Sequence, residues 1–140
     1  MSKAERALII VLRAVGVVCL LATFAVVMPR AWMAAIHEWV GLGRFPDAPI
    51  AEYLARSASA LYAFHGGLFL LISMDVRRYA AVLTYAAIAA IVFGPTLLVV
   101  DLSAGMPLHW TLQEGPFVLA LGVCLLGLQA RAKAAERQNP

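Results

Sequence analysis

The chain has 140 residues, of which 63% are hydrophobic and 14% charged, and its mean hydropathy is +0.85. A typical soluble domain has about 25% charged residues, so this composition excludes an ordinary soluble protein and favours a single integral membrane domain. The net charge of +3 comes from basic residues at the ends of apolar runs, which membrane topology explains, and it gives no sign of a nucleic-acid partner.

The first apolar run predicts a membrane span over residues 7–28, which exceeds the ~20 residues that a helix needs to cross a bilayer. The run is longer than the apolar region of a signal peptide, and no small-residue cleavage site precedes Pro29. Arg13 lies near the start of the run, where its side chain can reach the near interface, so we interpret it as an anchor. We therefore expect a retained span that ends at Pro29.

Residues 30–42 are too few to cross a membrane but have a helical pattern. Trp32, Ile36 and Trp39 recur at helical spacing, with polar residues at other positions. This pattern predicts a short amphipathic helix that lies in the membrane interface between the first two spans. Pro46 and Pro49 follow, and we expect them to delay the next helix until about residue 51.

The second span is predicted over residues 53–74 and contains small residues at every fourth position. Ala55, Ser59, Ala63 and Gly67 would share one helix face and let a neighbouring backbone approach closely. We interpret this face as a packing seam.

The third and fourth spans are predicted over residues 80–100 and 116–130. The third has a small-residue face of its own at Ala86, Ala90 and Gly94, and Pro95 predicts a kink. Pro116 would lie in the first turn of the fourth span, where a proline costs no hydrogen bond.

The distribution of basic residues predicts the orientation. One side of the predicted spans holds eight of them, Lys3, Arg6, Arg13, Arg77, Arg78, Arg131, Lys133 and Arg137. The other side holds three, Arg30, Arg44 and Arg56. By the positive-inside rule, both termini should lie in the cytoplasm, with the chain in a bacterial inner membrane.

Several polar residues should gather on the outer side, and they form the candidate ligand-binding set. These residues are Glu52, Arg56, Asp101, His109 and Glu114. In one interpretation Arg56 pairs with Asp101 or Glu114 and fixes the helix register. In the other, Arg56 holds an anionic headgroup or a carboxylate in an outward-facing pocket.

His65 and Tyr62 are the polar residues expected inside the membrane, with His65 roughly 15 Å deep at ~1.5 Å per residue. His65 could bind haem, relay protons, or form a hydrogen bond with a helix carbonyl or with a side chain such as Tyr62, Thr84 or Tyr85. A bis-histidine haem lacks a second histidine at that depth, because His37 and His109 both map to the outer interface, so we expect no cofactor.

The sequence contains no catalytic motif of a familiar kind. It lacks G-x-S-x-G, H-E-x-x-H and a phosphate-binding loop, so no catalytic residue is predicted. Cys19 and Cys124 each lie alone in an apolar run. We interpret them as inert thiols and predict no metal site.

The overall pattern resembles small bacterial four-span membrane proteins of the broadly DoxX-like kind. The features that carry this resemblance are the span ending at Pro29, the segment from Trp32 to Leu42, the Tyr-Leu-Ala-Arg-Ser start of the second span, its Gly66-Gly67 pair and the segment from Asp75 to Tyr79. The resemblance implies a compact four-helix membrane bundle and supplies no catalytic residue. The motif of four-span sterol isomerases of the emopamil-binding kind is not matched.

The sequence thus predicts an all-α, integral membrane four-helix bundle with one interfacial helix. The function expected first is that of a non-enzymatic accessory or structural component. Its partners would be membrane lipid, another membrane protein or a second copy of itself. The alternative is a lipid-directed enzyme, or a lipophilic-ligand binder, that uses the polar residues around Arg56.

Overall fold

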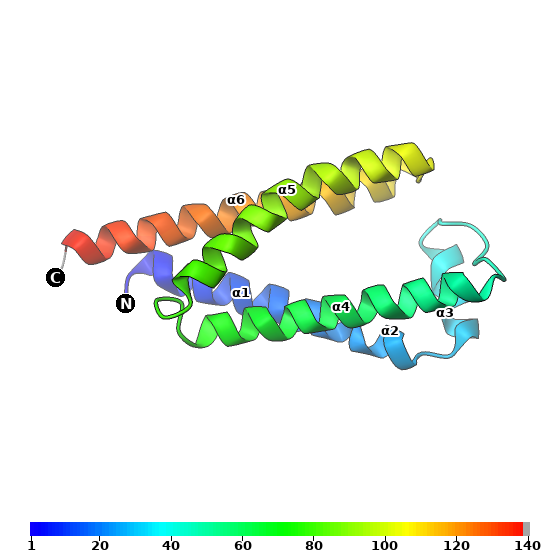
Figure 1. The fold of residues 1–140 in the computed structure, drawn as a ribbon, viewed down its shortest axis with the longest axis horizontal. Coiled ribbons are helices and arrows are strands. Elements are labelled where there is room, and N and C mark those ends of the chain that lie inside the picture. The colour runs from blue at the N-terminus through cyan, green and yellow to red at the C-terminus, as the bar shows by residue number, and fades with distance from the viewer. Residues whose placement is uncertain (139–140) are drawn as a thin grey trace. The chain divides into compact units, whose positions relative to one another are not determined.

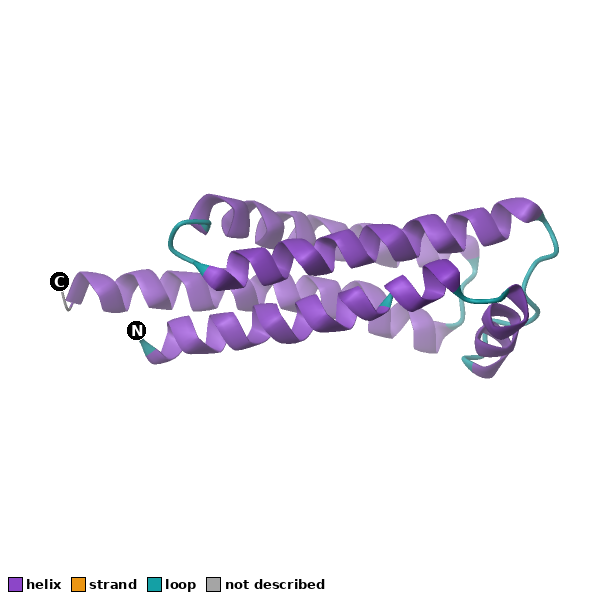
Figure 2. Ribbon diagram, turned by 90° about the horizontal axis from the view of Figure 1, so that it is seen from below, coloured by secondary structure: helices purple, strands orange, loops and turns teal. Residues whose placement is uncertain are grey.

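The computed structural model describes residues 1–138, and these residues form helices joined by loops and turns, without a β-strand (Figure 2). The all-α fold class predicted from the sequence is therefore confirmed. The helices in chain order are α1 (Lys3–Leu21), α2 (Thr23–Val27), α3 (Arg30–Trp39), α4 (Pro49–Met74), α5 (Ala80–Ala104) and α6 (Leu108–Gln138) (Figure 1).

Four helical segments are long and apolar enough to cross a membrane, judged by length and composition. The segments are Lys3–Val27, Pro49–Met74, Ala80–Ala104 and Leu108–Arg137. The first joins α1 to α2, which are separated only by a turn at Ala22. The shortest segment has 25 residues, more than the ~20 that a bilayer requires. The prediction of four apolar helices of spanning length is confirmed.

Helix α1 begins at Lys3, before the start of the predicted span at residue 7, because a capping box precedes it. The backbone N–H of Glu5 donates to Ser2 Oγ over 3.1 Å. In return, the Ser2 nitrogen donates to Glu5 Oε2 over 3.3 Å. This reciprocal pair satisfies N–H groups that the first turn of a helix leaves without partners.

Helices α4 and α6 also begin before the predicted spans. Helix α4 starts at Pro49 itself, because a proline in the first turn of a helix loses no hydrogen bond. Helix α6 starts at Leu108, and the Pro107 carbonyl accepts hydrogen bonds from the N–H groups of Trp110 and Thr111. Pro116, which we placed in the first turn, therefore lies inside the helix.

The chain divides into two compact units. Arg13–Leu70 form one, which we call the middle unit; it holds the C-terminal half of α1, all of α2 and α3, and most of α4. Met1–Leu12 and the chain from Leu71 onward form the other, which we call the terminal unit. Helices α1 and α4 each contribute residues to both units.

In the middle unit, α1 and α4 approach closely at two glycines. A Cβ atom added to Gly66 would lie 2.6 Å from the Gly16 carbonyl oxygen and 2.8 Å from the Leu20 nitrogen, closer than atoms can pack. Gly67 has no such neighbour within 4 Å and is exposed. The contact glycine is therefore Gly66, and the expected seam is corrected at Gly67, which lies next along the helix and faces another direction.

A compact group of contacts holds α3 to the loop that follows it, also within the middle unit. His37 Nδ1 lies 2.8 Å from the Gly43 carbonyl oxygen, and the His37 ring meets Phe45 edge-on. Arg30 donates to Asp47 Oδ1 over 3.0 Å. The helix ends at Trp39, and Gly43 adopts a positive φ of 80° that favours glycine.

In the terminal unit, α5 and α6 lie side by side (Figures 1 and 2), and they also approach through small residues. A Cβ atom on Gly94 would lie 2.7 Å from the Gly115 carbonyl oxygen, and one on Gly122 would lie 2.6 Å from the Ala87 carbonyl oxygen. The expected small-residue contact is thus confirmed at Gly94. The buried apolar side chains of this unit are Leu8, Leu12, Ile72, Val76, Leu83, Ala87 and Leu125.

Candidate functional site

Arg56, one of the hypothesised ligand residues, lies near the start of α4 and is the centre of a polar cluster in the middle unit. Its Nε and Nη2 atoms donate to Glu52 Oε1 over 3.0 and 2.8 Å. Nη2 also donates to the Met28 carbonyl oxygen over 2.9 Å, and Nη1 donates to the Val26 carbonyl oxygen. All three nitrogen atoms of the guanidinium are therefore hydrogen-bonded within the middle unit.

The two carbonyl groups that Arg56 contacts lie at the end of α2. The last carbonyl groups of a helix have no N–H partner within that helix, and the next residue, Pro29, has no N–H to offer. Met28 is extended, with φ −63° and ψ 138°, so the helix cannot continue. Arg56 supplies the missing donors from another helix, and its positive charge suits the negative end of the helix dipole.

Two of the hypothesised ligand residues, Arg56 and Glu52, are brought together by this arrangement. They lie one helical turn apart, and their side chains are 29% and 34% exposed. One interpretation of the sequence pairs Arg56 with Asp101 or Glu114, and both of those residues belong to the terminal unit. Within the middle unit, Arg56 forms an ion pair with Glu52, because residues four apart on a helix are neighbours.

The remaining hypothesised ligand residues, Asp101, His109 and Glu114, belong to the terminal unit. Asp101 lies near the end of α5 and is only 6% exposed, and its Oδ2 atom has no hydrogen-bond partner among the described residues. His109 and Glu114 lie near the start of α6. Glu114 Oε2 accepts a hydrogen bond from Trp110 Nε1 over 2.6 Å, within the same helix.

His65 contacts its own helix, as expected for one of the interpretations considered for it. Its Nδ1 atom lies 2.8 Å from the Leu61 carbonyl oxygen, one turn earlier in α4. A carbonyl can only accept, so this nitrogen carries the proton. The His65 side chain is exposed, and Tyr62 is 44% exposed.

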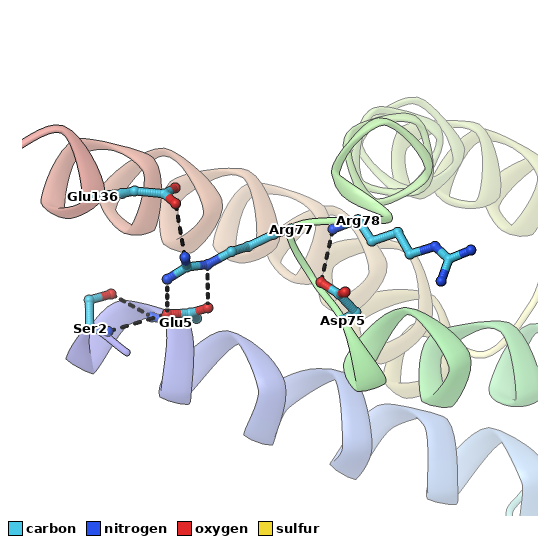
Figure 3. A network of polar contacts seen from close by, with 6 residues as sticks. All are labelled: Ser2, Glu5, Asp75, Arg77, Arg78 and Glu136. Carbon is cyan, nitrogen blue, oxygen red and sulfur yellow. Dashed lines mark hydrogen bonds and ion pairs between the residues drawn. The ribbon is translucent and has the colours of Figure 1, made fainter. Parts of the chain in front are cut away.

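A second polar cluster lies in the terminal unit and is centred on Arg77, in the loop between α4 and α5 (Figure 3). Arg77 Nε and Nη2 donate to the two carboxylate oxygens of Glu5 over 2.9 and 3.1 Å. Arg77 Nη1 donates to Glu136 Oε1 over 2.9 Å. One guanidinium therefore joins the start of α1, the α4–α5 loop and the end of α6.

Burial differs sharply among the three side chains of the Arg77 cluster. The Glu5 side chain is 10% exposed, whereas Glu136 and Arg77 are 53% and 57% exposed. The hydrogen bonds to Glu5, and then the charge of Glu136, raise the pKa of the Arg77 guanidinium above its ordinary value. Arg77 therefore remains charged and keeps the buried Glu5 carboxylate paired.

A cleft of about 110 Å³ adjoins the Arg77 cluster in the terminal unit. Its polar lining comes from Glu5, Arg77, Gln129, Lys133 and Glu136. Gln129 is only 6% exposed, and its Nε2 atom donates to the Ala80 carbonyl oxygen over 2.8 Å. The cleft therefore combines a buried amide with charged groups of both signs.

The Arg77 cluster was not predicted, although part of it has a local sequence signal. The Ser2-x-x-Glu5 spacing is that of a capping box, and it would have placed Glu5 in the first turn of a helix. The partnership of Arg77 with Glu5 and Glu136 has no such signal, because 72 and 59 residues separate the partners.

Neither cluster has the composition of a metal site or of a nucleophile with its base. Within residues 1–138, no group of three or more His, Cys, Asp or Glu side chains could hold a metal ion. Arg56 and Arg77 are positively charged hydrogen-bond donors directed at carbonyl and carboxylate oxygens. Both arrangements therefore join separate segments of the chain.

A comparison of the chain with protein-family models, curated proteins and solved structures finds no match. The function of the chain is therefore inferred from its own residues and contacts.

Proposed function

We propose that the chain is a non-enzymatic membrane protein that acts as a structural or accessory component and contacts lipid or another membrane protein. The observation that carries this proposal is the set of hydrogen bonds made by Arg56. Its donors are directed at Glu52 and at the carbonyl groups that end α2. A guanidinium whose N–H groups donate to acceptors within its own unit stabilises the fold and has fewer donors for an anionic ligand.

The proposed location is the bacterial inner membrane, with both termini in the cytoplasm. Four apolar helices of spanning length support a membrane location, and the excess of basic residues beside the termini supports this orientation. Helix α3 would lie in the outer interface, where Trp32 and Trp39, 65% and 85% exposed, would reach the headgroup region. A DoxX-like family membership is part of the same proposal.

The proposal is tested by replacing Arg56 with glutamine in the full chain. Arg56→Gln leaves two carbonyl groups and a carboxylate without their charged donor, which should lower the free energy of unfolding by about 2 kcal/mol. Arg56→Lys should recover only part of this loss, since an ammonium cannot match the planar geometry of a guanidinium. The free energies of unfolding are measured by denaturing the protein in micelles and following its helix content by circular dichroism.

The matched control is Arg44→Gln, which removes an equal charge from a side chain that is 83% exposed. Its effect should stay within about 0.5 kcal/mol. Native mass spectrometry of the same samples tests the alternative function. If wild-type protein retains a lipophilic ligand that Arg56→Gln loses with its stability unchanged, the chain is a ligand binder and the structural proposal is rejected.

A further inference from the structure

The terminal unit has a strongly basic end, formed by the start of α1, the α4–α5 loop and the last turns of α6. Among the described residues of this end, six exposed basic side chains make no ion pair with a described carboxylate. They are Lys3, Arg6, Arg78, Arg131, Lys133 and Arg137.

Among its described residues, this end has seven basic side chains, Arg77 included, and only three acidic ones, Glu5, Asp75 and Glu136. Glu5 and Glu136 both accept hydrogen bonds from Arg77. Asp75 Oδ1 accepts the backbone N–H of Arg78 over 2.9 Å. Figure 3 shows the Arg78 side chain extending away from Glu5 and Glu136. The basic end therefore carries a net positive charge that is open to an anionic partner.

The cleft beside Arg77 lies at this end, and its two carboxylates, Glu5 and Glu136, are already paired with Arg77. Lys133 lines the cleft and is one of the six uncompensated basic residues. Gln129 also lines it and is 94% buried, and its amide nitrogen gives one hydrogen to the Ala80 carbonyl oxygen. An amide nitrogen carries two hydrogens, and the bond to Ala80 uses one of them. Leu8 and Val76 add an apolar wall.

We infer that this cleft binds the headgroup of an anionic phospholipid, with the phosphate held by Lys133 and the Gln129 amide. The inference rests on the proposed membrane location, which places the basic end at the cytoplasmic leaflet. Anionic lipids concentrate there and attract basic side chains near the surface. The apolar wall favours a phospholipid over a free phosphate ion, because the glycerol and the first acyl carbons need an apolar surface.

Arg77 has a different task at this site. Its bonds to Glu5 and Glu136 hold three segments together, so Lys133 on α6 and Leu8 on α1 line one cleft. Arg77 is therefore a positioning residue, whereas Lys133 and the Gln129 amide contact the phosphate of the lipid.

The test uses native mass spectrometry of the full chain, titrated with phosphatidylglycerol and with phosphatidylcholine of identical acyl chains. Phosphatidylglycerol should bind with a Kd at least about fivefold lower, since each basic residue near a membrane surface contributes about this factor. Lys133→Gln should remove most of that difference, and Lys133→Arg should retain it. Arg44→Gln, which removes one exposed charge from the middle unit, should leave the ratio of the two Kd values unchanged.

Four results would overturn the inference. These are equal Kd values for the two lipids, an unchanged ratio in Lys133→Gln, an equal loss in Arg44→Gln, and competition by soluble glycerol phosphate as strong as that by the lipid. The last would assign the cleft to a soluble anion. Because the test measures lipid preference and the Arg56 test measures stability and ligand retention, failure of one is distinguishable from failure of the other.

Discussion

Arg77 has two carboxylate partners whose burial is very different, and this difference predicts unequal effects of mutation. Arg77→Gln leaves the buried Glu5 carboxylate without its charged partner, which is costly. Glu136→Gln removes an exposed pair that contributes little. We expect Arg77→Gln to lower the denaturation midpoint clearly more than Glu136→Gln does, as measured by circular dichroism in micelles.

A second variant checks the cause of the Arg77 effect. Adding Glu5→Gln to Arg77→Gln removes the unpaired buried charge and should restore part of the lost stability. Additive effects of the two substitutions would show that the side chains do not interact.

At the residue scale, the sequence predicts contacts between residues that are close along the chain. It does not predict contacts between residues that are far apart along the chain. Glu52 and Arg56 are four residues apart, a spacing that brings side chains together on a helix. The carbonyl groups of Val26 and Met28 are 30 and 28 residues away from Arg56. The sequence predicts that this span ends near Pro29, but it does not show which distant side chain supplies donors to these carbonyl groups.

At the element scale, the glycine contacts give a prediction with a built-in control. Gly66→Ala would force a Cβ atom to 2.6 Å from the Gly16 carbonyl oxygen and should cost about 1–3 kcal/mol of stability through overpacking. Gly67→Ala meets nothing within 4 Å and should be neutral or slightly stabilising, since alanine favours a helix over glycine. Denaturant titration in micelles would show no loss of stability in either variant if the α1–α4 contact were absent.

The sequence predicts which segments are helical much better than it predicts where each helix begins or which face of it contacts a neighbouring helix. Long apolar runs indicate the spanning helices directly. The early starts of α1 and α4 depend on Ser2 and Pro49, whose side chains suit a first turn. One member of the predicted contact face of α4 was misplaced by one position, because Gly66 and Gly67 are both small and residue size alone does not show which one faces α1.

For the whole molecule, the proposed orientation makes a prediction about chemical accessibility. In a chain with Cys19 and Cys124 replaced by alanine, a single cysteine at Ala48 should react with a membrane-impermeant maleimide added to intact cells. A single cysteine at Ala134 should react only after the cells are permeabilised. Ala48 and Ala134 are both exposed, so the reversed pattern would show that the termini face outward.

The function of the whole molecule could be predicted from the sequence only as far as its broad class. The excess of apolar residues indicates a membrane protein, and the basic residues indicate a cytoplasmic side. The partners of Arg56 could not be predicted, because backbone carbonyl groups carry no side-chain signature. The cleft at Lys133 was missed for a related reason, since its walls come from both ends of the chain.

The cap that Arg56 provides for α2 also bears on how the protein is made. Val26 and Met28 are synthesised before Arg56, so their carbonyl groups must first accept hydrogen bonds from water. Those groups receive their lasting donors only once α4 has been delivered beside α1. The segment α1–α2 and helix α4 should therefore reach their final structure as a pair. Translation must pass Arg56 before α2 acquires its final conformation.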